Sequence, residues 1–323
     1  MKIFVTRNIP EPGLKLLEKH HQVEVNPYDR ILKKEEIIKG VKGKDGLLCL
    51  LTDLIDAEVI NSEPKLKMIA NYAVGYDNID VKAATKKGIP VSNTPGVLTN
   101  ATSDMAWALL FSVARRIVEA DKFTREGKFK GWGPMLMHGQ DVTNRTLGVV
   151  GAGRIGTAFA LKSKGFNMTV LYVDGKKNET LEKKVNAKKV TFDELLKKSD
   201  FISLHVPLMP STHHMIGEKE LKMMKKNAVL INTSRGPIID EQALVFALKE
   251  KQIFGVGLDV YEHEPEITDE LKKLDNAIIQ PHSASATIEA RTKMAVMSAE
   301  NMLVGLKGEI PNNCVNKEVF NGR

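Results

Sequence analysis

Cysteine, aromatic residues and long apolar runs are all scarce in this sequence. The 323 residues include two cysteines, Cys49 and Cys314, and 6% aromatic residues. Two cysteines can build neither a disulfide framework nor a multi-cysteine metal site, so we expect no bound metal and a reducing, cytoplasmic location. The longest uncharged apolar stretch, Met105 to Ala114, falls well short of the roughly 20 residues that span a membrane. The sequence therefore predicts a protein that is not embedded in a membrane.

The excess of positive charge is small and scattered. Lysine and arginine number 47 against 40 acidic residues, a net charge of +7. A nucleic-acid-binding protein gathers its cations on one face and interleaves them with aromatic residues. Here the lysines occur as separate pairs, such as Lys176-Lys177 and Lys225-Lys226, on the polar sides of predicted helices. This pattern is typical of a solvated surface and predicts no nucleic-acid partner.

The length favours two domains, because one hydrophobic core rarely exceeds about 250–300 residues. In the first 95 or so residues, short apolar runs alternate with helical patterns. This alternation predicts a parallel sheet with helices packed on its faces. We expect strands at Lys2–Thr6, Gln22–Val25, Gly46–Leu51, Leu66–Ala70 and Pro90–Ser92, and helices that include Pro12–Lys19 and Val81–Lys87.

The pattern changes at Thr99, where residues 100–104 can cap a helix that is apolar on more than one face. A loop rich in glycine and methionine follows at residues 127–140, and a second α/β unit runs from Thr146 to about His282. The last predicted helix, Ile288–Leu306, can return to the first unit. We therefore expect one domain at residues 1–98 and 287–323, and a second domain at residues 99–286.

A glycine motif marks the start of the second unit. The predicted strand Thr146–Val150 leads directly into Gly151-Ala152-Gly153-Arg154-Ile155-Gly156, and a helical pattern follows. In a dinucleotide-binding site the first glycine permits a tight turn, the second lets the pyrophosphate approach the backbone, and the third lets helix and strand pack closely. The N-terminus of the helix offers free N–H groups to the phosphates.

Asp174 lies 18 positions after the third glycine, at the end of the next predicted strand. A carboxylate at this place accepts hydrogen bonds from a ribose 2′-OH and repels a 2′-phosphate. We therefore expect NAD as the cofactor. Lys176 and Lys177 can neutralise a phosphate, which leaves NADP open.

Three side chains suited to hydride transfer follow later predicted strands of this unit: Arg235, Glu264 and His282. The carboxyl ends of parallel strands share one edge of the sheet, where ligands bind. Arginine can bind a carboxylate through two parallel N–H bonds. Histidine can protonate a developing alkoxide near neutral pH, and a neighbouring carboxylate favours the protonated ring. Together they predict reduction of a 2-oxo acid.

Each of the three also has a purely structural interpretation. Arg235 can pair with Asp240, Glu264 can be one of several exposed acids, and His282 can be a hydrogen-bonded residue after Pro281. Because the three residues follow a dinucleotide-binding motif in the same unit, the catalytic interpretation of the set is favoured. The other histidines lack such a setting and are predicted to be structural or exposed: His20, His21, His138, His205, His213 and His214.

Several motifs in register give the whole chain a family resemblance. It resembles the D-isomer-specific 2-hydroxyacid dehydrogenases, and within them it is most similar to the glyoxylate/hydroxypyruvate reductases. The stretches that carry the resemblance are residues 71–80 (NYAVGYDNID), the glycine motif, Val206-Pro207-Leu208, residues 232–236 (NTSRG), residues 258–265 (LDVYEHEP) and Pro281-His282.

The resemblance implies a fold of two doubly wound parallel-sheet domains, with a Rossmann cofactor domain inserted into a flavodoxin-like substrate domain. It implies that Arg235, Glu264 and His282 are the catalytic set, that the N–H groups of Val74 and Gly75 hold the substrate carboxylate, and that Asp259 binds the nicotinamide amide. The remaining cofactor contacts are expected at Gly151, Gly153, Arg154, Ile155, Gly156, Asp174, Pro207 and Thr233.

The family is usually a homodimer formed through the cofactor domains, and the apolar helix around Trp107 and Leu110 is consistent with this assembly. In some reductases of the group, a tryptophan of the neighbouring subunit contacts the substrate, and Trp132 matches that position. The chain departs from the family after the catalytic histidine, where Ser283-Ala284 replaces the usual Ile-Gly. The added methyl group of Ala284 is expected to lower activity or shift the substrate range.

Substrate size follows from charge. The loops at residues 51–54 and 71–75 contain no basic residue, so a phosphorylated substrate would lack a partner. We expect small unphosphorylated 2-oxo acids: glyoxylate, hydroxypyruvate or 2-ketogluconate. Two other functions remain open. One is a regulatory protein that senses NAD without catalysis, and the other is a sibling dehydrogenase that acts on formate or phosphite.

Overall fold

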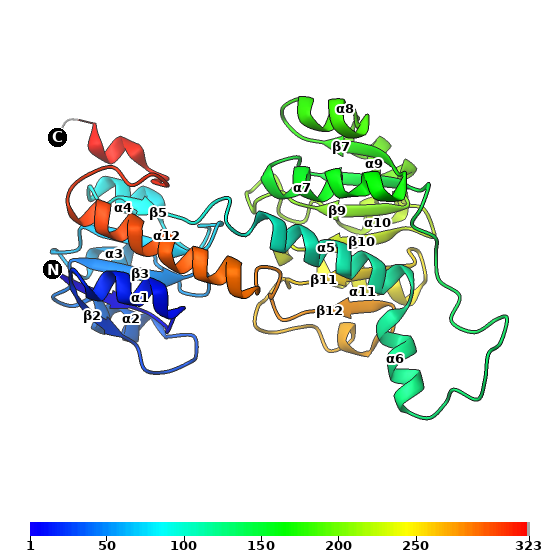
Figure 1. Cartoon of the computed structure of the whole chain (residues 1–323), viewed down its shortest axis with the longest axis horizontal. Helices are drawn as coiled ribbons and strands as arrows, with labels where there is room; N and C mark the ends of the chain where they lie inside the picture. Colours follow the sequence, from blue (N-terminus) through cyan, green and yellow to red (C-terminus); the bar gives the residue numbers. More distant parts are fainter. Residues whose placement is uncertain (322–323) are drawn as a thin grey trace. The chain divides into compact units, whose positions relative to one another are not determined.

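A computed structural model of the chain describes residues 1–321, which divide into two compact units (Figure 1). Unit 1 comprises Met1–Leu98 and the segment from Ala286 onward, and unit 2 comprises Thr99–Ser285. Each unit is an α/β structure with its own sheet and its own core. No helix within residues 1–321 has the length and apolar character needed to cross a membrane.

Unit 1 contains a five-stranded sheet in which every pair of neighbours is parallel. The strand order β2-β1-β3-β4-β5 is the order of flavodoxin-like folds. Central strands with helices on both faces must be apolar on both sides, and this explains the nearly unbroken apolar run GLLCL of β3. The strands are β1 (Lys2–Val5), β2 (Gln22–Val25), β3 (Gly46–Leu50), β4 (Met68–Tyr72) and β5 (Val91–Ser92).

Helices cover both faces of this sheet. The long helix α12 packs against α1 and against β4, so the segment after residue 286 completes the unit begun by the N-terminus. The opposite face is covered by α2, α3 and α4, whose buried residues Ile37, Val59 and Ala84 belong to one core cluster. The helices are α1 (Glu11–Glu18), α2 (Lys34–Val41), α3 (Ala57–Asn61), α4 (Val81–Lys86) and α12 (Ile288–Leu306), with a short 3-10 helix at Lys317–Phe320.

Unit 2 contains a seven-stranded parallel sheet with the order β12-β11-β10-β9-β6-β7-β8. If the strands of this unit are numbered in chain order and read from the β8 edge, their order is 3-2-1-4-5-6-7. This is the Rossmann arrangement. The order reverses between β6 and β9, and ligands bind at such a switch point. The strands are β6 (Thr146–Val150), β7 (Thr169–Val173), β8 (Lys188–Lys189), β9 (Phe201–Leu204), β10 (Val229–Asn232), β11 (Gly255–Leu258) and β12 (Ala277–Ile279).

Two helical layers cover the sheet of unit 2. One core cluster joins α5, α7 and α8 to one face, and a second joins α9, α10 and α11 to the other. The helices are α5 (Thr99–Ala114), α6 (Ile117–Arg125), α7 (Arg154–Lys162), α8 (Glu179–Val185), α9 (Phe192–Lys198), α10 (Glu218–Met223) and α11 (Glu241–Lys249), with 3-10 helices at Ser163–Phe166, Gly236–Ile238 and Leu271–Lys273.

The helix α5 corrects one expectation and bears on another. Residues 100–104 lie inside its first turns and are not caps, because the helix already begins at Thr99. Trp107 and Leu110 are buried within unit 2, where the indole Nε1 of Trp107 donates to the carbonyl of Phe159 at 3.0 Å. The helix is apolar on several faces because it contacts both the sheet and α7. Trp107 and Leu110 are therefore covered within the chain itself, and the homodimer stays a prediction.

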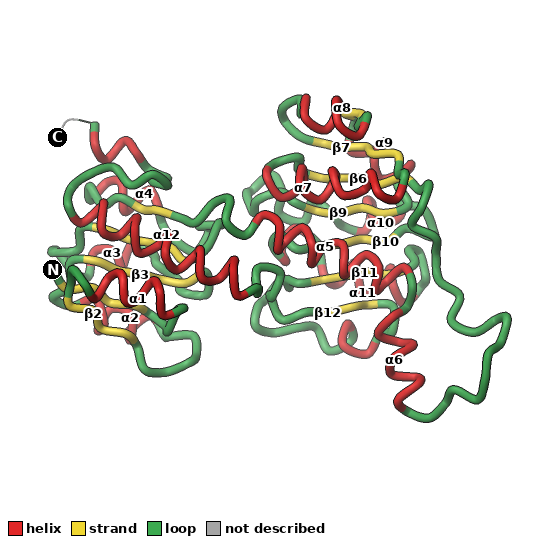
Figure 2. The backbone as a smooth tube through the Cα atoms, viewed as in Figure 1, coloured by secondary structure: helices red, strands yellow, loops and turns green. Residues whose placement is uncertain are grey.

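The loop at residues 127–140 contains no helix or strand, as predicted (Figure 2). It extends away from the sheet of unit 2 after α6 (Figure 1). Its large apolar side chains are exposed, and Trp132 has 86% of its surface accessible. The exposed apolar residues of this region are Ile117, Val118, Phe129, Trp132, Met135 and Leu136.

The predicted fold class, two parallel α/β sheets with a Rossmann unit, is confirmed by these sheet orders. The predicted helix Ile288–Leu306 coincides with α12. One strand lies two residues later than expected, at Met68–Tyr72 instead of Leu66–Ala70. The polar residues Asn71 and Tyr72 continue the strand because they pair with Cys49 and Leu50 of β3, a contact that local hydropathy does not reveal.

Candidate active site

The glycine motif forms the turn between β6 and α7, at the switch point of the sheet in unit 2. Gly151 has a φ of +91°, a left-handed conformation that L side chains rarely adopt. A Cβ atom at Gly156 would lie 2.0 Å from the carbonyl oxygen of Gly151, so only glycine permits this close contact between helix and turn. Both residues therefore have the backbone roles that the motif predicts.

The same turn has the features of a phosphate cradle. A Cβ atom at Gly153 would meet nothing within 4 Å, so the space above this residue is open. Gly153 is the N-cap of α7 and provides no side-chain cap, which leaves the first N–H groups of the helix available. Arg154 is exposed and Ile155 half-buried in the first turn. These residues fit a bound dinucleotide.

Two further predicted cofactor residues follow neighbouring strands at the same edge. Pro207 comes after β9, and its carbonyl accepts a hydrogen bond from the Thr212 hydroxyl at 2.7 Å. Thr233 comes after β10, and its buried hydroxyl has no hydrogen-bond partner within residues 1–321. A buried hydroxyl without a partner is costly, and a polar ligand would satisfy it. The Thr233 hydroxyl therefore lacks a partner in the protein alone, as expected for a cofactor site.

Asp174 directly follows β7 and contacts the glycine turn. One carboxylate oxygen accepts from the N–H of Ala152 at 2.8 Å, and the other accepts from the N–H of Lys176 at 3.0 Å. Lys177, one of the two lysines that could offset this charge, is paired with Glu182 at 2.9 Å. The negative charge of Asp174 thus stays beside the turn, where the ribose of a dinucleotide would lie.

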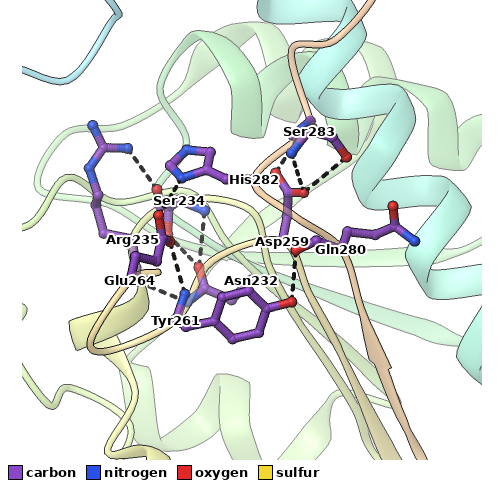
Figure 3. Close-up of polar contacts among 10 residues, drawn as sticks. Asn232, Ser234, Arg235, Asp259, Tyr261, Glu264, Gln280, His282 and Ser283 are labelled. Carbon is purple, nitrogen blue, oxygen red and sulfur yellow. Dashed lines mark hydrogen bonds and ion pairs between the residues drawn. The ribbon is translucent and has the colours of Figure 1, made fainter. Parts of the chain in front are cut away.

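Arg235 follows β10 in a turn built by Asn232 (Figure 3). The side-chain amide of Asn232 donates to the carbonyl of Arg235 at 2.9 Å, and its oxygen accepts from the N–H of Ser234 at 3.0 Å. The Arg235 guanidinium donates to the carbonyl of Ser234 at 2.8 Å. A Cβ atom at Gly236 would lie 1.8 Å from the backbone of Tyr261, so this glycine brings the turn against the loop after β11.

Glu264 and His282 form a direct pair (Figure 3). The ring nitrogen Nδ1 of His282 lies 2.8 Å from Oε2 of Glu264, although 18 residues separate them in the chain. The second carboxylate oxygen, Oε1, accepts from the N–H of Tyr261 at 3.0 Å. Both side chains keep about a quarter of their surface exposed, 25% for His282 and 28% for Glu264. A ligand can therefore reach the pair.

The charge of the pair follows from its surroundings. Burial raises the pKa of Glu264, but His282, the N–H of Tyr261 and the charge of Arg235 lower it by more, so the pKa lies below its ordinary value. Glu264 is therefore a carboxylate at neutral pH and can accept a hydrogen bond from Nδ1 of His282. Because Nδ1 is bonded to Glu264, Nε2 is the nitrogen available to donate a proton to a ligand.

Asp259 holds the backbone that follows His282. Its two carboxylate oxygens accept from the N–H groups of Ser283 at 2.7 Å and Ala284 at 2.8 Å. Burial raises the pKa of Asp259 despite these two donors. His282 itself has a φ of +52°, an unfavourable conformation for a residue with a side chain. The two bonds to Asp259 fix the strained turn and thereby the direction of the imidazole.

Sequence reasoning missed three residues of this network: Asn232, Tyr261 and Ser283. The Tyr261 hydroxyl donates to the carbonyl of Gln280 at 2.7 Å, and the Ser283 hydroxyl lies 3.4 Å from Asp259. A signal existed for Asn232, since a polar group at the end of an apolar strand needs a partner there. Residues 1–321 contain no cluster of three or more histidine, cysteine or acidic residues that could hold a metal ion.

The other predicted substrate residues lie elsewhere in the chain. Val74 and Gly75 follow β4 in unit 1 and are half-buried. Trp132 lies on the exposed loop of unit 2 at residues 127–140. His205, interpreted as structural, is half-buried, packs against Phe159 and contacts Ser203 at 2.9 Å.

Comparison with known proteins supports the same family. Residues 107–284, more than half of the chain, match the model of the D-isomer specific 2-hydroxyacid dehydrogenase, NAD binding domain. The chain is 54% identical to a glyoxylate reductase of Korarchaeum cryptofilum over 324 residues, which cover 100% of this chain and 98% of the relative. It is 52% identical to a glyoxylate reductase of Thermococcus litoralis, with 99% and 98% covered.

A solved structure shows the same architecture. The TT0316 protein of Thermus thermophilus superposes with a TM-score of 0.92 at 43% identity, covering 98% of this chain and 100% of that protein. The family predicted from the motifs is thus confirmed. The chain belongs to the D-isomer specific 2-hydroxyacid dehydrogenase family, and unit 2 contains its NAD-binding domain.

Proposed function

We propose that this dehydrogenase reduces small unphosphorylated 2-oxo acids, glyoxylate and hydroxypyruvate, to D-2-hydroxy acids. The observation that carries the proposal is the 2.8 Å contact between His282 and Glu264, beside Arg235, at the edge of the sheet that also bears the glycine turn. The two relatives compared above are named glyoxylate reductases, which supports glyoxylate as a substrate.

In this proposal each residue has one chemical task. Arg235 binds the substrate carboxylate through paired N–H bonds and polarises the adjacent keto oxygen. The N–H groups of Val74 and Gly75 also bind the carboxylate. Bound NADH supplies a hydride to the keto carbon. His282 donates a proton from Nε2 to the keto oxygen, and Glu264 stabilises the protonated ring before transfer and fixes its orientation.

The cofactor would be held by the glycine turn, the first turn of α7 and the Thr233 hydroxyl. Asp259 would contact the nicotinamide amide in addition to holding the backbone after His282. Asp174 favours NAD because its charge repels a 2′-phosphate, and the pairing of Lys177 with Glu182 removes one cation that could counter it. Lys176 remains exposed, so NADPH is expected as a poorer substrate.

Small substrates are favoured by the charge of unit 1. The loops at residues 51–54 and 71–75 carry no cation, and Arg7 after β1 is paired with Asp29 at 3.1 Å. A phosphate group brought to these loops would have no free basic partner, and a buried unpaired charge is costly.

We also propose a homodimer located in the cytoplasm. The exposed apolar side chains of α6 and the loop at residues 127–140 form a surface that a second copy would cover. Trp132 on this loop would then contact substrate in the other subunit. The two cysteines are free and buried, which is compatible with a reducing compartment.

The test is the loss of NADH absorbance when the purified protein is mixed with NADH and a panel of 2-oxo acids. Turnover of glyoxylate and hydroxypyruvate supports the proposal. Tight NADH binding with no turnover of any acid would indicate a regulatory NAD-sensing protein. Reduction of NAD by formate or phosphite would indicate a sibling dehydrogenase. Sedimentation of wild-type and W132A protein tests the dimer.

A further inference from the structure

Three consecutive carbonyl groups after β4 are held by hydrogen bonds. The carbonyl of Ala73 accepts from the backbone N–H of Thr94 at 2.8 Å. The next, of Val74, accepts from the side-chain amide of Asn93 at 2.7 Å. The third, of Gly75, accepts from the side-chain amide of Asn71 at 2.8 Å. These three hydrogen bonds thus fix the orientation of three successive peptide groups in the loop.

Fixing a carbonyl also fixes the N–H of the same peptide group. A trans peptide is planar, and its C=O and N–H point in opposite directions. The bond from Thr94 therefore orients the N–H of Val74, and the bond from Asn93 orients the N–H of Gly75. Within residues 1–321, neither of these two N–H groups donates a hydrogen bond. The N–H of Val74 therefore points away from Thr94 and the N–H of Gly75 points away from Asn93, so both are available to a ligand.

Asn93 is itself held firmly. It is 9% exposed, its N–H donates to the carbonyl of Asn313 at 3.2 Å, and its carbonyl accepts from the side-chain amide of Asn301 at 3.1 Å. Asn301 lies on α12, more than 200 residues away in the chain. These two backbone bonds hold Asn93 in the position from which its side-chain amide donates to the Val74 carbonyl. Because the buried side chain is already ordered, forming this hydrogen bond costs little further conformational entropy.

We propose that Asn93 is a positioning residue for substrate binding: its amide turns the N–H of Gly75 toward the substrate carboxylate, while Thr94 does the same for Val74. The inference rests on the proposed function, in which these two N–H groups bind the carboxylate. Asn71 supports the same loop from the other end, since its amide also contacts Asn78 at 3.2 Å. The ligand class is a small carboxylate.

The decisive variant is N93L, which keeps the approximate size of the side chain and removes the amide donor. We expect the KM for glyoxylate to rise about tenfold or more, with kcat and the KM for NADH close to wild type, because a hydrogen bond to a charged group is weakened in both ground and transition states. N316L is the matched control. Asn316 is fully buried in unit 1, and its side chain forms hydrogen bonds with Val91, Thr85 and Ile89, all outside residues 73–76.

Should N93L fail to fold, N93S replaces it, because a serine hydroxyl is too short to reach the Val74 carbonyl. A wild-type KM in either Asn93 variant overturns the proposal. An equal rise of KM in N316L also overturns it, because general loosening of unit 1 would then explain the effect.

A second measurement separates this inference from the proposed function. In protein labelled with ¹⁵N-glycine, N93L should shift the amide resonance of Gly75 without any ligand, whereas N316L should not. An unmoved Gly75 resonance overturns the positioning role even if the wild type reduces glyoxylate. A shifted resonance supports that role even if the wild type turns over no 2-oxo acid, an outcome that would instead reject the proposed function.

Discussion

The hydroxyl of Tyr261 donates a hydrogen bond to the carbonyl of Gln280 at 2.7 Å, and this bond joins two loops of the candidate active site. Tyr261 also donates its backbone N–H to Glu264, and Gln280 lies two residues before His282. The two members of the Glu264–His282 pair are therefore tied together through backbone as well as through their own contact.

The first prediction concerns this tie. Y261F should lower kcat because Glu264 and His282 are no longer held in register, and it should lower the free energy of unfolding by about 1 kcal/mol, the usual net value of a buried hydrogen bond. Steady-state kinetics and urea unfolding measure the two effects. Y172F removes another buried tyrosine hydroxyl of unit 2, which contacts Glu182 at 2.9 Å. It should cost similar stability and leave kcat unchanged at saturating NADH.

The second prediction concerns the proton donor. H282Q should bind NADH as wild type does, while kcat falls about 10²–10⁴-fold, the usual contribution of a general acid. Fluorescence titration measures NADH binding and stopped-flow absorbance measures turnover. H214Q is the control, because His214 forms a similar pair with Glu262 at 2.6 Å outside the proposed catalytic set. Wild-type turnover in H282Q would remove His282 from the mechanism.

The third prediction concerns Arg235. R235K should mainly raise the KM for glyoxylate and reduce kcat less, because lysine keeps the charge but cannot form two parallel N–H bonds with a carboxylate. The comparison of KM and kcat between wild type and variant measures this directly. An unchanged KM would show that Arg235 does not bind the carboxylate.

The fourth prediction concerns cofactor choice. D174N should lower the ratio of kcat/KM for NADH over NADPH, because the neutral amide no longer repels a 2′-phosphate, while its oxygen can still accept from Ala152. Kinetics with both reduced cofactors measures the ratio. D193N, an exposed acidic position of α9, is the matched control and should keep the wild-type ratio. A NADPH preference in the wild type would contradict the role of Asp174.

The fifth prediction concerns pH and stability. Burial lowers the pKa of His205 to about 3, whereas an unfolded histidine has a pKa of about 6.5. Between these values the unfolded state binds a proton that the folded state does not, so the free energy of unfolding falls as pH decreases, by about 1.4 kcal/mol per pH unit from this residue.

Urea unfolding between pH 4 and pH 8, an interval spanning the roughly 6.5 of free histidine, measures this effect. H205Q should flatten the loss of stability below about pH 6.5, and its stability relative to wild type should improve as pH falls. H138Q, which changes an exposed histidine of the same unit, should keep the wild-type slope. Parallel slopes in wild type and H205Q would show that His205 is protonated in the folded protein.

Much of the fold could be predicted because its signals are local. Glycine at positions 151 and 156 meets requirements of backbone conformation and close contact, and these requirements hold for any chain that makes this turn. Alternating apolar strands and helices specify parallel sheets. Trp107 and Leu110 do not by themselves indicate a dimer, because an apolar helix can be covered by its own sheet and neighbouring helix.

The sequence by itself determined the family, the two parallel sheets and the residue types available for hydride transfer, since each depends on residues adjacent in the chain or on motif spacing. Only the tertiary structure decided which groups orient those residues. Asp259 fixes the turn after His282, Tyr261 joins the loops of Glu264 and His282, and Asn93 fixes Val74. The physical reason is that a hydrogen bond requires two groups within about 3 Å at a defined angle, and residues distant in sequence reach that geometry only when the sheets assemble.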